Sequence, residues 1–257
     1  MAFKIALSAG HGKYTAGKRC LKSLDSKETR EWVLNSRIAD KIENLLKDYS
    51  GYELLRLDDR SGVTDVSLMT RSDAANKFKA DFYLAVHHNA GVNGGKGGGI
   101  VAFTYTKPSA KSLEWQKDLY NALIAKTGLR GNRSVPLAKA NLHECREPYM
   151  PAVLLELGFM DSITDVPVIL TEKYAEQCAQ AIVGVIADKG KLAKKQTSYK
   201  VRVTVDALNI RAGAGTQYKI NGCITDQGVY TIVEEKDGFL KLKSGAGWIS
   251  ANYVKKI

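Results

Sequence analysis

Four histidines and two unusually placed glutamates carry most of the chemistry that this chain of 257 residues could perform. His11 stands between glycines in LSAGHG, directly after an apolar stretch, and His87 and His88 end a second apolar stretch, DFYLAVHHNA. Because neighbouring residues of a strand point to opposite faces, at most one of His87 and His88 can share a site with His11. A catalytic zinc ion is typically held by three protein groups and one water, so two histidines would need one further ligand.

The third ligand is sought among two glutamates near the start of a predicted helix, DSKETREWVLNSRIADKI. We assign Glu28 to a capping box, in which it reaches back to Asp25 at the helix start. Glu31 lies three residues before Leu34, on the inward stripe of the helix, where an unpaired carboxylate is costly. Either a metal ion or the guanidinium of Arg71 could pair with Glu31, and we favour the metal.

Glu156 lies inside MPAVLLELGFMD, a stretch that is otherwise almost wholly apolar. A glutamate in a buried strand is rarely tolerated without a reason. One interpretation is a buried ion pair. The other, which we favour, is a catalytic acid or base whose pKa is raised by its surroundings.

The elements that must position these residues alternate between strand and helix as far as residue 189. This alternation favours an α/β fold, a mixed and mostly parallel sheet flanked by helices, in which ligands bind at the carboxyl ends of strands. The predicted strands are FKIALSA, YELLRL, DFYLAVHHNA, GGIVAFTY and PAVLLELGF, and the predicted helices cover 28–48, SLMTRSDAANKF, 109–126 and 171–187.

The pattern changes after residue 189. DKGKLAKKQTS is rich in lysine and poor in large apolar residues, which is typical of a linker. Short strands separated by Gly, Asn and Asp follow without a helical period, which favours a small β-barrel. We therefore predict a first domain over 1–189, a linker over 190–198 and a second domain over 199–257.

Composition narrows the class of protein. The net charge of +11 favours a polyanionic partner such as nucleic acid, anionic lipid or an anionic cell wall. No apolar run is long enough to cross a bilayer. The first residues lack the apolar core of a signal peptide, so we expect synthesis in the cytoplasm.

Four segments together resemble the zinc-dependent N-acetylmuramoyl-L-alanine amidases, which cut bacterial peptidoglycan. They are LSAGHG, REWVLNSRIA, VHHNA and PAVLLELGF, in the order found in that family. The resemblance implies that His11, Glu31 and His87 bind Zn²⁺ and that Glu156 is the general acid or base. Within VHHNA, the family's histidine is the one two residues before the asparagine.

The same resemblance leaves several neighbouring residues open. Arg71 and Asn89 would either hold the ligands in place or contact substrate. Arg130 and Arg133, in LRGNRS, either bind carboxylates of the stem peptide or belong to a solvated loop. We expect the glycine-rich loop at 91–99 to be mobile and to lie beside the cleft.

Two segments depart from the family. SAGHG stands where the family usually has an acidic or polar residue and a proline before Gly-His. LHECREPYMP stands where the family is mostly apolar. His143 and Glu144 would therefore either line the cleft or lie on the surface, and we favour a surface position for the histidine.

The second domain resembles the bacterial SH3-like modules that tether enzymes to the wall. The matching segments are ALNIRAGAGTQY and DGFLKLKSGAGWISANYV. Tyr218, Trp248 and Tyr253, with Tyr230 and Phe239, are candidates for a wall-binding face, although at least half of these aromatic residues should fill the core.

The resemblance implies a lytic enzyme that cleaves the amide between N-acetylmuramic acid and L-alanine. We expect a monomeric phage or prophage endolysin that acts on peptidoglycan after the membrane is permeabilised, without nucleic acid or membrane as a partner. The alternative enzymes are a host autolysin and a zinc carboxypeptidase or deacetylase of peptidoglycan. The alternatives without catalysis are a wall protein that only binds and a nucleic-acid binder, which only the positive net charge supports.

Overall fold

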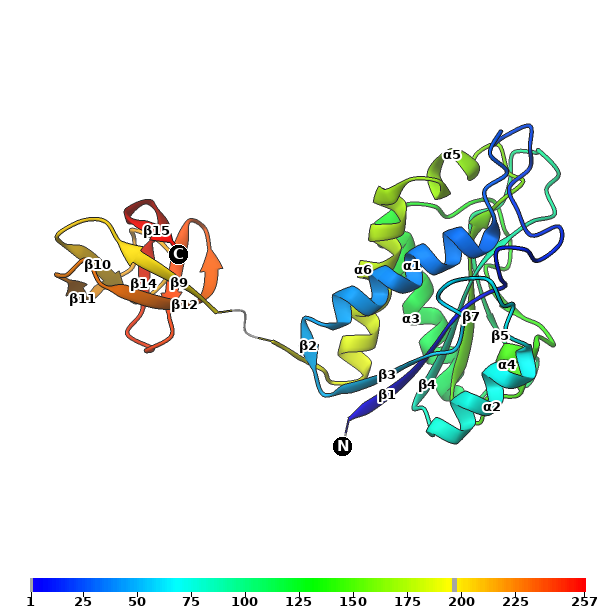
Figure 1. Ribbon diagram of the computed structural model, residues 1–257, viewed down its shortest axis with the longest axis horizontal. Coiled ribbons are helices and arrows are strands. Elements are labelled where there is room, and N and C mark those ends of the chain that lie inside the picture. Colours follow the sequence, from blue (N-terminus) through cyan, green and yellow to red (C-terminus); the bar gives the residue numbers. More distant parts are fainter. Residues whose placement is uncertain (1, 196–197) are drawn as a thin grey trace. The chain divides into compact units, whose positions relative to one another are not determined.

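The structure is a computed structural model that describes residues 2–195 and 198–257 (Figure 1). The chain divides into two compact units, Met1–Lys194 and Lys195–Ile257, each with its own apolar core. The division falls within the predicted linker 190–198, of which residues 196 and 197 lie outside the described residues. Among the described helices, none is long and apolar enough to cross a membrane.

A six-stranded sheet forms the middle of the first unit, in the order β3-β1-β4-β7-β5-β6. Strands β3, β1, β4 and β7 run parallel, β5 is antiparallel to β7, and β6 is parallel to β5. The predicted mixed and mostly parallel sheet is therefore confirmed. Its strands are β1 (Phe3–Ala9), β3 (Tyr52–Arg56), β4 (Phe82–Asn89), β5 (Ile100–Thr104), β6 (Leu137–Lys139) and β7 (Ala152–Phe159). A separate two-stranded pair joins β2 (Tyr49–Ser50) to β8 (Ala193–Lys194).

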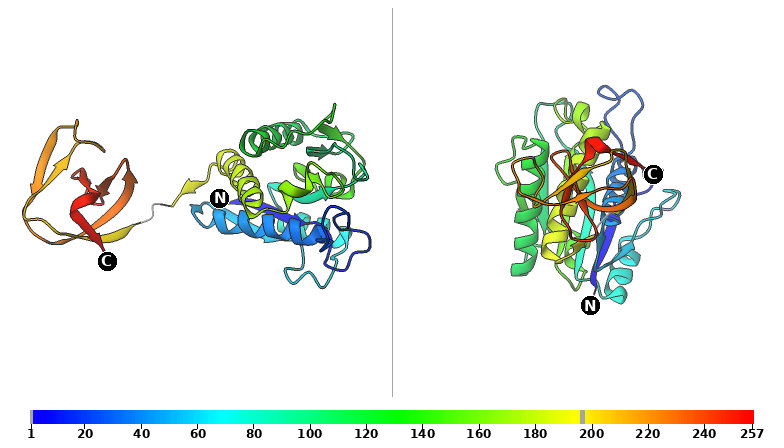
Figure 2. Two further views of the ribbon diagram at one scale, coloured as in Figure 1. Left: turned by 90° about the horizontal axis from the view of Figure 1, so that it is seen from above. Right: turned by 90° about the vertical axis from the view of Figure 1, so that its left-hand side faces the viewer.

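Helices cover both faces of this sheet (Figure 1). Helices α1, α3 and α6 pack on one face, and α3 and α6 lie side by side in both views of Figure 2. Helices α2 and α4 cover the other face. The helices are α1 (Glu31–Leu46), α2 (Leu68–Phe78), α3 (Ala110–Thr127), α4 (His143–Arg146), α5 (Val166–Ile169) and α6 (Glu172–Lys189).

The two central strands, β4 and β7, are buried on both faces, which explains their almost continuous apolar sequences. Successive side chains of β7 lie on opposite faces of the sheet. Val153 and Leu155 belong to the core under α1, α3 and α6, whereas Ala152 and Leu154 belong to the core under α2 and α4. By this alternation Glu156 falls on the face covered by α2 and α4.

The predicted capping box at the start of α1 is wrong, because the helix begins only at Glu31. Asp25 closes a turn before the helix, accepting the backbone N–H of Lys27 at 3.1 Å and of Thr29 at 2.7 Å. Glu28 follows in a left-handed conformation with φ of 48°, which no helical residue adopts. The turn before α1, rather than a helix cap, thus positions Glu31 next to the sheet.

The second unit is an all-β unit built on one seven-stranded antiparallel sheet, in the order β11-β10-β14-β13-β12-β9-β15. Its core consists of Val201, Val203, Leu208, Ile224, Ile232, Leu240, Leu242 and Ile249. The elements are β9 (Tyr199–Val203), β10 (Leu208–Arg211), β11 (Ile220–Ile224), β12 (Val229–Lys236), β13 (Phe239–Leu242), β14 (Trp248–Ser250), the 3-10 turn η1 (Ala251–Tyr253) and β15 (Val254–Lys256).

Candidate metal centre and active site

His11 lies in a tight turn directly after β1, at the carboxyl end of the sheet. Its backbone is left-handed, with φ of 64°, and the N–H of Gly10 donates to the carbonyl of Val86 on β4 at 3.0 Å. Position 10 has no room for a side chain, because a Cβ atom there would overlap the His87 ring. Glycine therefore allows the two imidazoles to approach edge to face, with ring centroids 5.0 Å apart.

Glu31 is held by groups from α1 and β4. Its Oε1 atom accepts the backbone N–H of His88 at 3.2 Å and the side-chain amide of Asn35 at 3.3 Å. Its Oε2 atom is buried and makes no hydrogen bond within the described residues, although His11 Nε2 lies 3.3 Å and Lys18 Nζ 3.7 Å away. Arg71 contacts other groups, so the arginine that could have paired with Glu31 does not do so.

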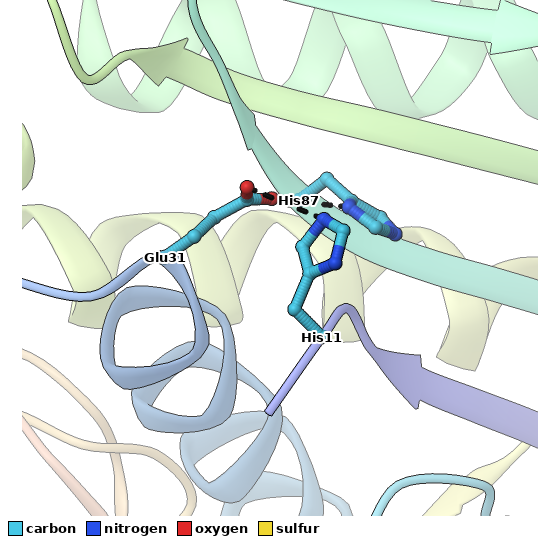
Figure 3. Close-up of side chains that lie close together, drawn as sticks. All are labelled: His11, Glu31 and His87. Atoms are coloured by element: carbon cyan, nitrogen blue, oxygen red, sulfur yellow. Dashed lines mark hydrogen bonds and ion pairs between the residues drawn. The ribbon is translucent and has the colours of Figure 1, made fainter. Parts of the chain in front are cut away.

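His11, Glu31 and His87 converge on one point (Figure 3). Each offers one ligand atom, and these atoms lie within 4.8 Å of one another. Two imidazole nitrogens and a carboxylate oxygen form a donor set that catalytic zinc uses. Glu31 Oε2 fits the same conclusion, because it is a buried carboxylate oxygen that accepts no hydrogen bond within the described residues. The cluster could therefore hold a metal ion.

Charges within the cluster shift the pKa values of its members. Burial alone would raise the pKa of Glu31, but the hydrogen bond and charge of His87, with His11 and Lys18, outweigh burial and lower it to about 2. Burial alone would lower the pKa of His87, but hydrogen bonds to Glu144 and Glu31 outweigh burial and raise it to about 10. A metal ion bound at His87 would therefore displace a proton.

Glu156 lies beside His87, because the two residues are register partners on the parallel strands β7 and β4. Its Oε2 atom is buried without a hydrogen-bond partner in the described part of the chain, which argues against a buried ion pair. Burial raises the pKa of Glu156 to about 7, a rise that His87 opposes and Glu31 supports. A carboxyl group with such a pKa can give and take a proton near neutral pH.

Arg71 and Asn89 occupy different environments. Arg71 is only 1% exposed, and its Nη1 atom donates to Ser8 Oγ at 2.7 Å and to the carbonyl of Ala9 at 2.6 Å. It therefore holds the end of β1 in place. Asn89, at the end of β4, accepts the backbone N–H of Ala90 at 2.8 Å through its side chain.

The sequence pattern left open whether Glu144 lines the cleft or lies on the surface. It lies on the short helix α4, is 2% exposed and faces His87, with its Oε2 atom 3.1 Å from His87 Nε2. His143, its neighbour, turns the other way and lies 3.1 Å from Ser72 Oγ on α2. A four-residue helix has no period to read, so only the polar interruption before Pro151 pointed to this position.

A cavity of about 330 Å³ opens beside the cluster. It is lined by His11, Asp65, Val66, Ser67, Leu68, Arg71, His87 and Glu144. The cavity therefore reaches His11 and His87, two of the three candidate ligands, from the side of α2, where a substrate could approach.

The glycine-rich loop, which we expected to be mobile, is anchored at both ends. Three consecutive N–H groups, of residues 91–93, donate to Asp161 Oδ2 at 2.8, 2.9 and 2.7 Å. At the other end, the N–H of Gly99 donates to Asp165 Oδ2 at 2.7 Å.

The remaining candidates lie outside this cavity. Arg130 and Arg133 are exposed, and the Arg133 guanidinium lies 4.4 Å from the centre of the Phe159 ring. In the second unit, Tyr218 and Tyr253 are about half exposed, whereas Trp248 is only 8% exposed and offers little surface to a ligand.

Comparison with known proteins agrees with this geometry. The family model described as N-acetylmuramoyl-L-alanine amidase matches residues 5–188. The sporulation-specific N-acetylmuramoyl-L-alanine amidase of Bacillus subtilis is 29% identical over 214 residues, 82% of this chain and 77% of that protein. The endolysin of Bacillus phage SPP1 is 27% identical over 256 residues, 99% of this chain and 85% of that protein.

A solved structure is similar as well. The crystal structure of N-acetylmuramoyl-L-alanine amidase from Clostridium difficile 630 matches with a TM-score of 0.65 and 27% identity, over 73% of this chain and 96% of that one. The resemblance predicted from four short segments is thus confirmed at the level of the family: this chain belongs to the N-acetylmuramoyl-L-alanine amidases and is a peptidoglycan hydrolase.

Proposed function

We propose that the chain is a zinc-dependent amidase in which His11, Glu31 and His87 hold the metal and Glu156 is the acid and base. The observation that carries the proposal is the convergence of three ligand atoms beside Glu156, whose Oε2 atom is buried without a hydrogen-bond partner among the described residues. Bound zinc would lower the pKa of water from 15.7 to about 7 and polarise the substrate carbonyl.

The chain's own residues supply the remaining steps. Glu156 takes a proton from the attacking water, whose oxygen bonds to the lactyl carbonyl carbon of N-acetylmuramic acid. The C–N bond to L-alanine then breaks, and Glu156 delivers the proton to the leaving nitrogen. The products are a lactyl carboxylic acid and a stem peptide with a free amino terminus. Proton transfer of this kind contributes about 10²–10⁴-fold in rate.

Mass spectrometry of digested Gram-positive peptidoglycan tests this mechanism. The wild type should release stem peptides that begin with L-alanine, and EDTA should abolish the release until zinc is restored. Glu156→Gln should lose about 10²–10⁴-fold in rate while binding zinc normally. Glu147→Gln is the matched control, because Glu147 is exposed and paired with Arg146. Release of D-alanine or acetate instead would identify a carboxypeptidase or a deacetylase.

We also propose that the second unit is an SH3-like barrel that binds the wall. Tyr253 and Phe239 line a groove of about 490 Å³, together with polar groups such as Arg211 and Asp237. Tyr253→Ala should weaken sedimentation with purified peptidoglycan, and Tyr218→Ala, outside that groove, should not. The opposite result would move the binding face from this groove to the surface around Tyr218.

The biological role that fits best is that of a phage or prophage endolysin. The match to the SPP1 endolysin supports it, because that match extends over both units of this chain. Bacteria that produce the protein should lyse only after a membrane-permeabilising agent is added. Lysis without such an agent would instead favour an exported host autolysin.

A further inference from the structure

We infer that Glu144 is a positioning residue for the metal site, which accepts the Nε2 proton of His87 and so directs Nδ1 toward the metal. The inference rests on the metal site proposed above and assigns a role to a residue outside the three ligands. Ligating histidines usually donate their second ring N–H to a carboxylate, carbonyl or water.

The two ring nitrogens of His87 face different carboxylates. Nδ1 lies 3.1 Å from Glu31 Oε1, on the side of the cluster, and Nε2 lies 3.1 Å from Glu144 Oε2, on the side of α4. Glu144 is not one of the three residues whose ligand atoms converge. Its carboxylate can therefore act on the metal only through the imidazole.

A chain of donors fixes the charge state of Glu144. Arg71 can only donate, so Ser8 Oγ accepts a hydrogen bond from Arg71 Nη1 at 2.7 Å, and its hydroxyl donates a hydrogen bond to Glu144 Oε1 at 2.6 Å. The Tyr83 hydroxyl donates to the same oxygen at 2.8 Å. With two donors on Oε1, the carboxylate is held ionised, and Oε2 remains to accept from His87.

The consequence is a single tautomer. An imidazole that donates from Nε2 presents its lone pair at Nδ1, which is the nitrogen that faces Glu31. The ring is also fixed in orientation, because it is bound at both edges.

Zinc affinity and histidine tautomer test the inference without relying on activity. In competition with a chromophoric chelator, Glu144→Ala should bind zinc about 10–100-fold more weakly than the wild type. Glu144→Gln, whose side-chain oxygen still accepts a hydrogen bond, should lose less. Glu147→Gln, on the exposed side of the same segment, should match the wild type within about twofold.

Nitrogen-15 NMR of the zinc-loaded wild type gives a readout that needs no variant to fold. We expect His87 to carry its proton on Nε2 in the wild type and in Glu144→Gln. A proton on Nδ1 would overturn the inference, as would equal zinc affinity in Glu144→Ala and the wild type. Normal zinc affinity with a collapsed kcat would instead make Glu144 the acid or base. If the wild type binds no zinc, the proposed metal site itself fails.

Discussion

The His87 ring packs so closely against Gly10 that any side chain at position 10 would overlap the ring. Gly10→Ala would push a methyl group into the ring and move His87 away from Glu31. We expect zinc affinity to fall at least about 10-fold and hydrolysis to fall with it. Chelator competition and peptidoglycan digestion measure the two effects. Wild-type zinc affinity in Gly10→Ala would show that the two imidazoles need not approach as they do here.

Asp25 gives a prediction about pH. Burial alone would raise its pKa, but hydrogen bonds from Thr29 and Lys27 outweigh burial and lower it. A carboxyl group whose pKa is lower in the folded state stabilises the fold at pH values above its unfolded-state pKa, near 3.9. This stabilisation is lost as the pH falls through the lower, folded-state pKa. Asp25→Asn should thus cost about 1–2 kcal/mol at pH 7 and less near pH 3.

Urea unfolding of the wild type and Asp25→Asn at the two pH values measures this difference. Asp48→Asn serves as the control, because that carboxylate is exposed and should change stability by less than about 0.5 kcal/mol. An undiminished difference at pH 3 would mean that the turn does not depend on the charge of Asp25.

At the scale of elements, two glycines of the first unit should respond in opposite directions to alanine. Gly98 has φ of 115°, and a Cβ atom there would collide with the Asp165 carboxylate that anchors the loop. Gly98→Ala should destabilise the unit by about 2–4 kcal/mol. Gly184 lies in α6 with open space around it, so Gly184→Ala should stabilise by about 0.5–1 kcal/mol. Thermal unfolding compares the pair, and a destabilised Gly184→Ala would contradict the open space.

The long elements could be predicted from the sequence because burial imposes a period on them. The central strands β4 and β7 read as continuous apolar runs, and the inward stripe of α1 is enough to single out Glu31. Short elements such as α4, α5 and β6 have too few residues for a period to show. The prediction of a capping box was wrong for a different reason. A single left-handed residue such as Glu28 does not change the pattern of apolar residues, so the sequence did not reveal it.

The site could be predicted only in part, for a related reason. Types and spacing singled out His11, Glu156 and one of the pair His87 and His88, and the family resemblance chose His87. The strands that carry these residues end or pass at the same edge of the sheet. The residues that hold these side chains in place do so through contacts between segments far apart in the sequence. Glu144 reaches His87, and Arg71 reaches Ser8, over sequence separations that no local pattern records.

At the scale of the whole molecule, the two units should separate cleavage from attachment. A protein ending at residue 194 should still cleave a soluble muropeptide at the full-length rate, because the first unit holds the whole cluster and its own core. On intact sacculi it should be at least about 10-fold slower, since tethering raises the local concentration of substrate. Equal rates on sacculi would mean that residues 195–257 contribute nothing to attachment.

The position of β7 in the sheet also decides when the enzyme can first act during its own synthesis. β7 is the last of the six strands along the chain, yet it lies between β4 and β5 and completes the sheet. Until residue 159 has left the ribosome, β4 and β5 each have an unpaired edge, in addition to the outer edges of β3 and β6, and Glu156 is not yet beside His87. The site therefore cannot be complete before all six strands of the first sheet have been translated.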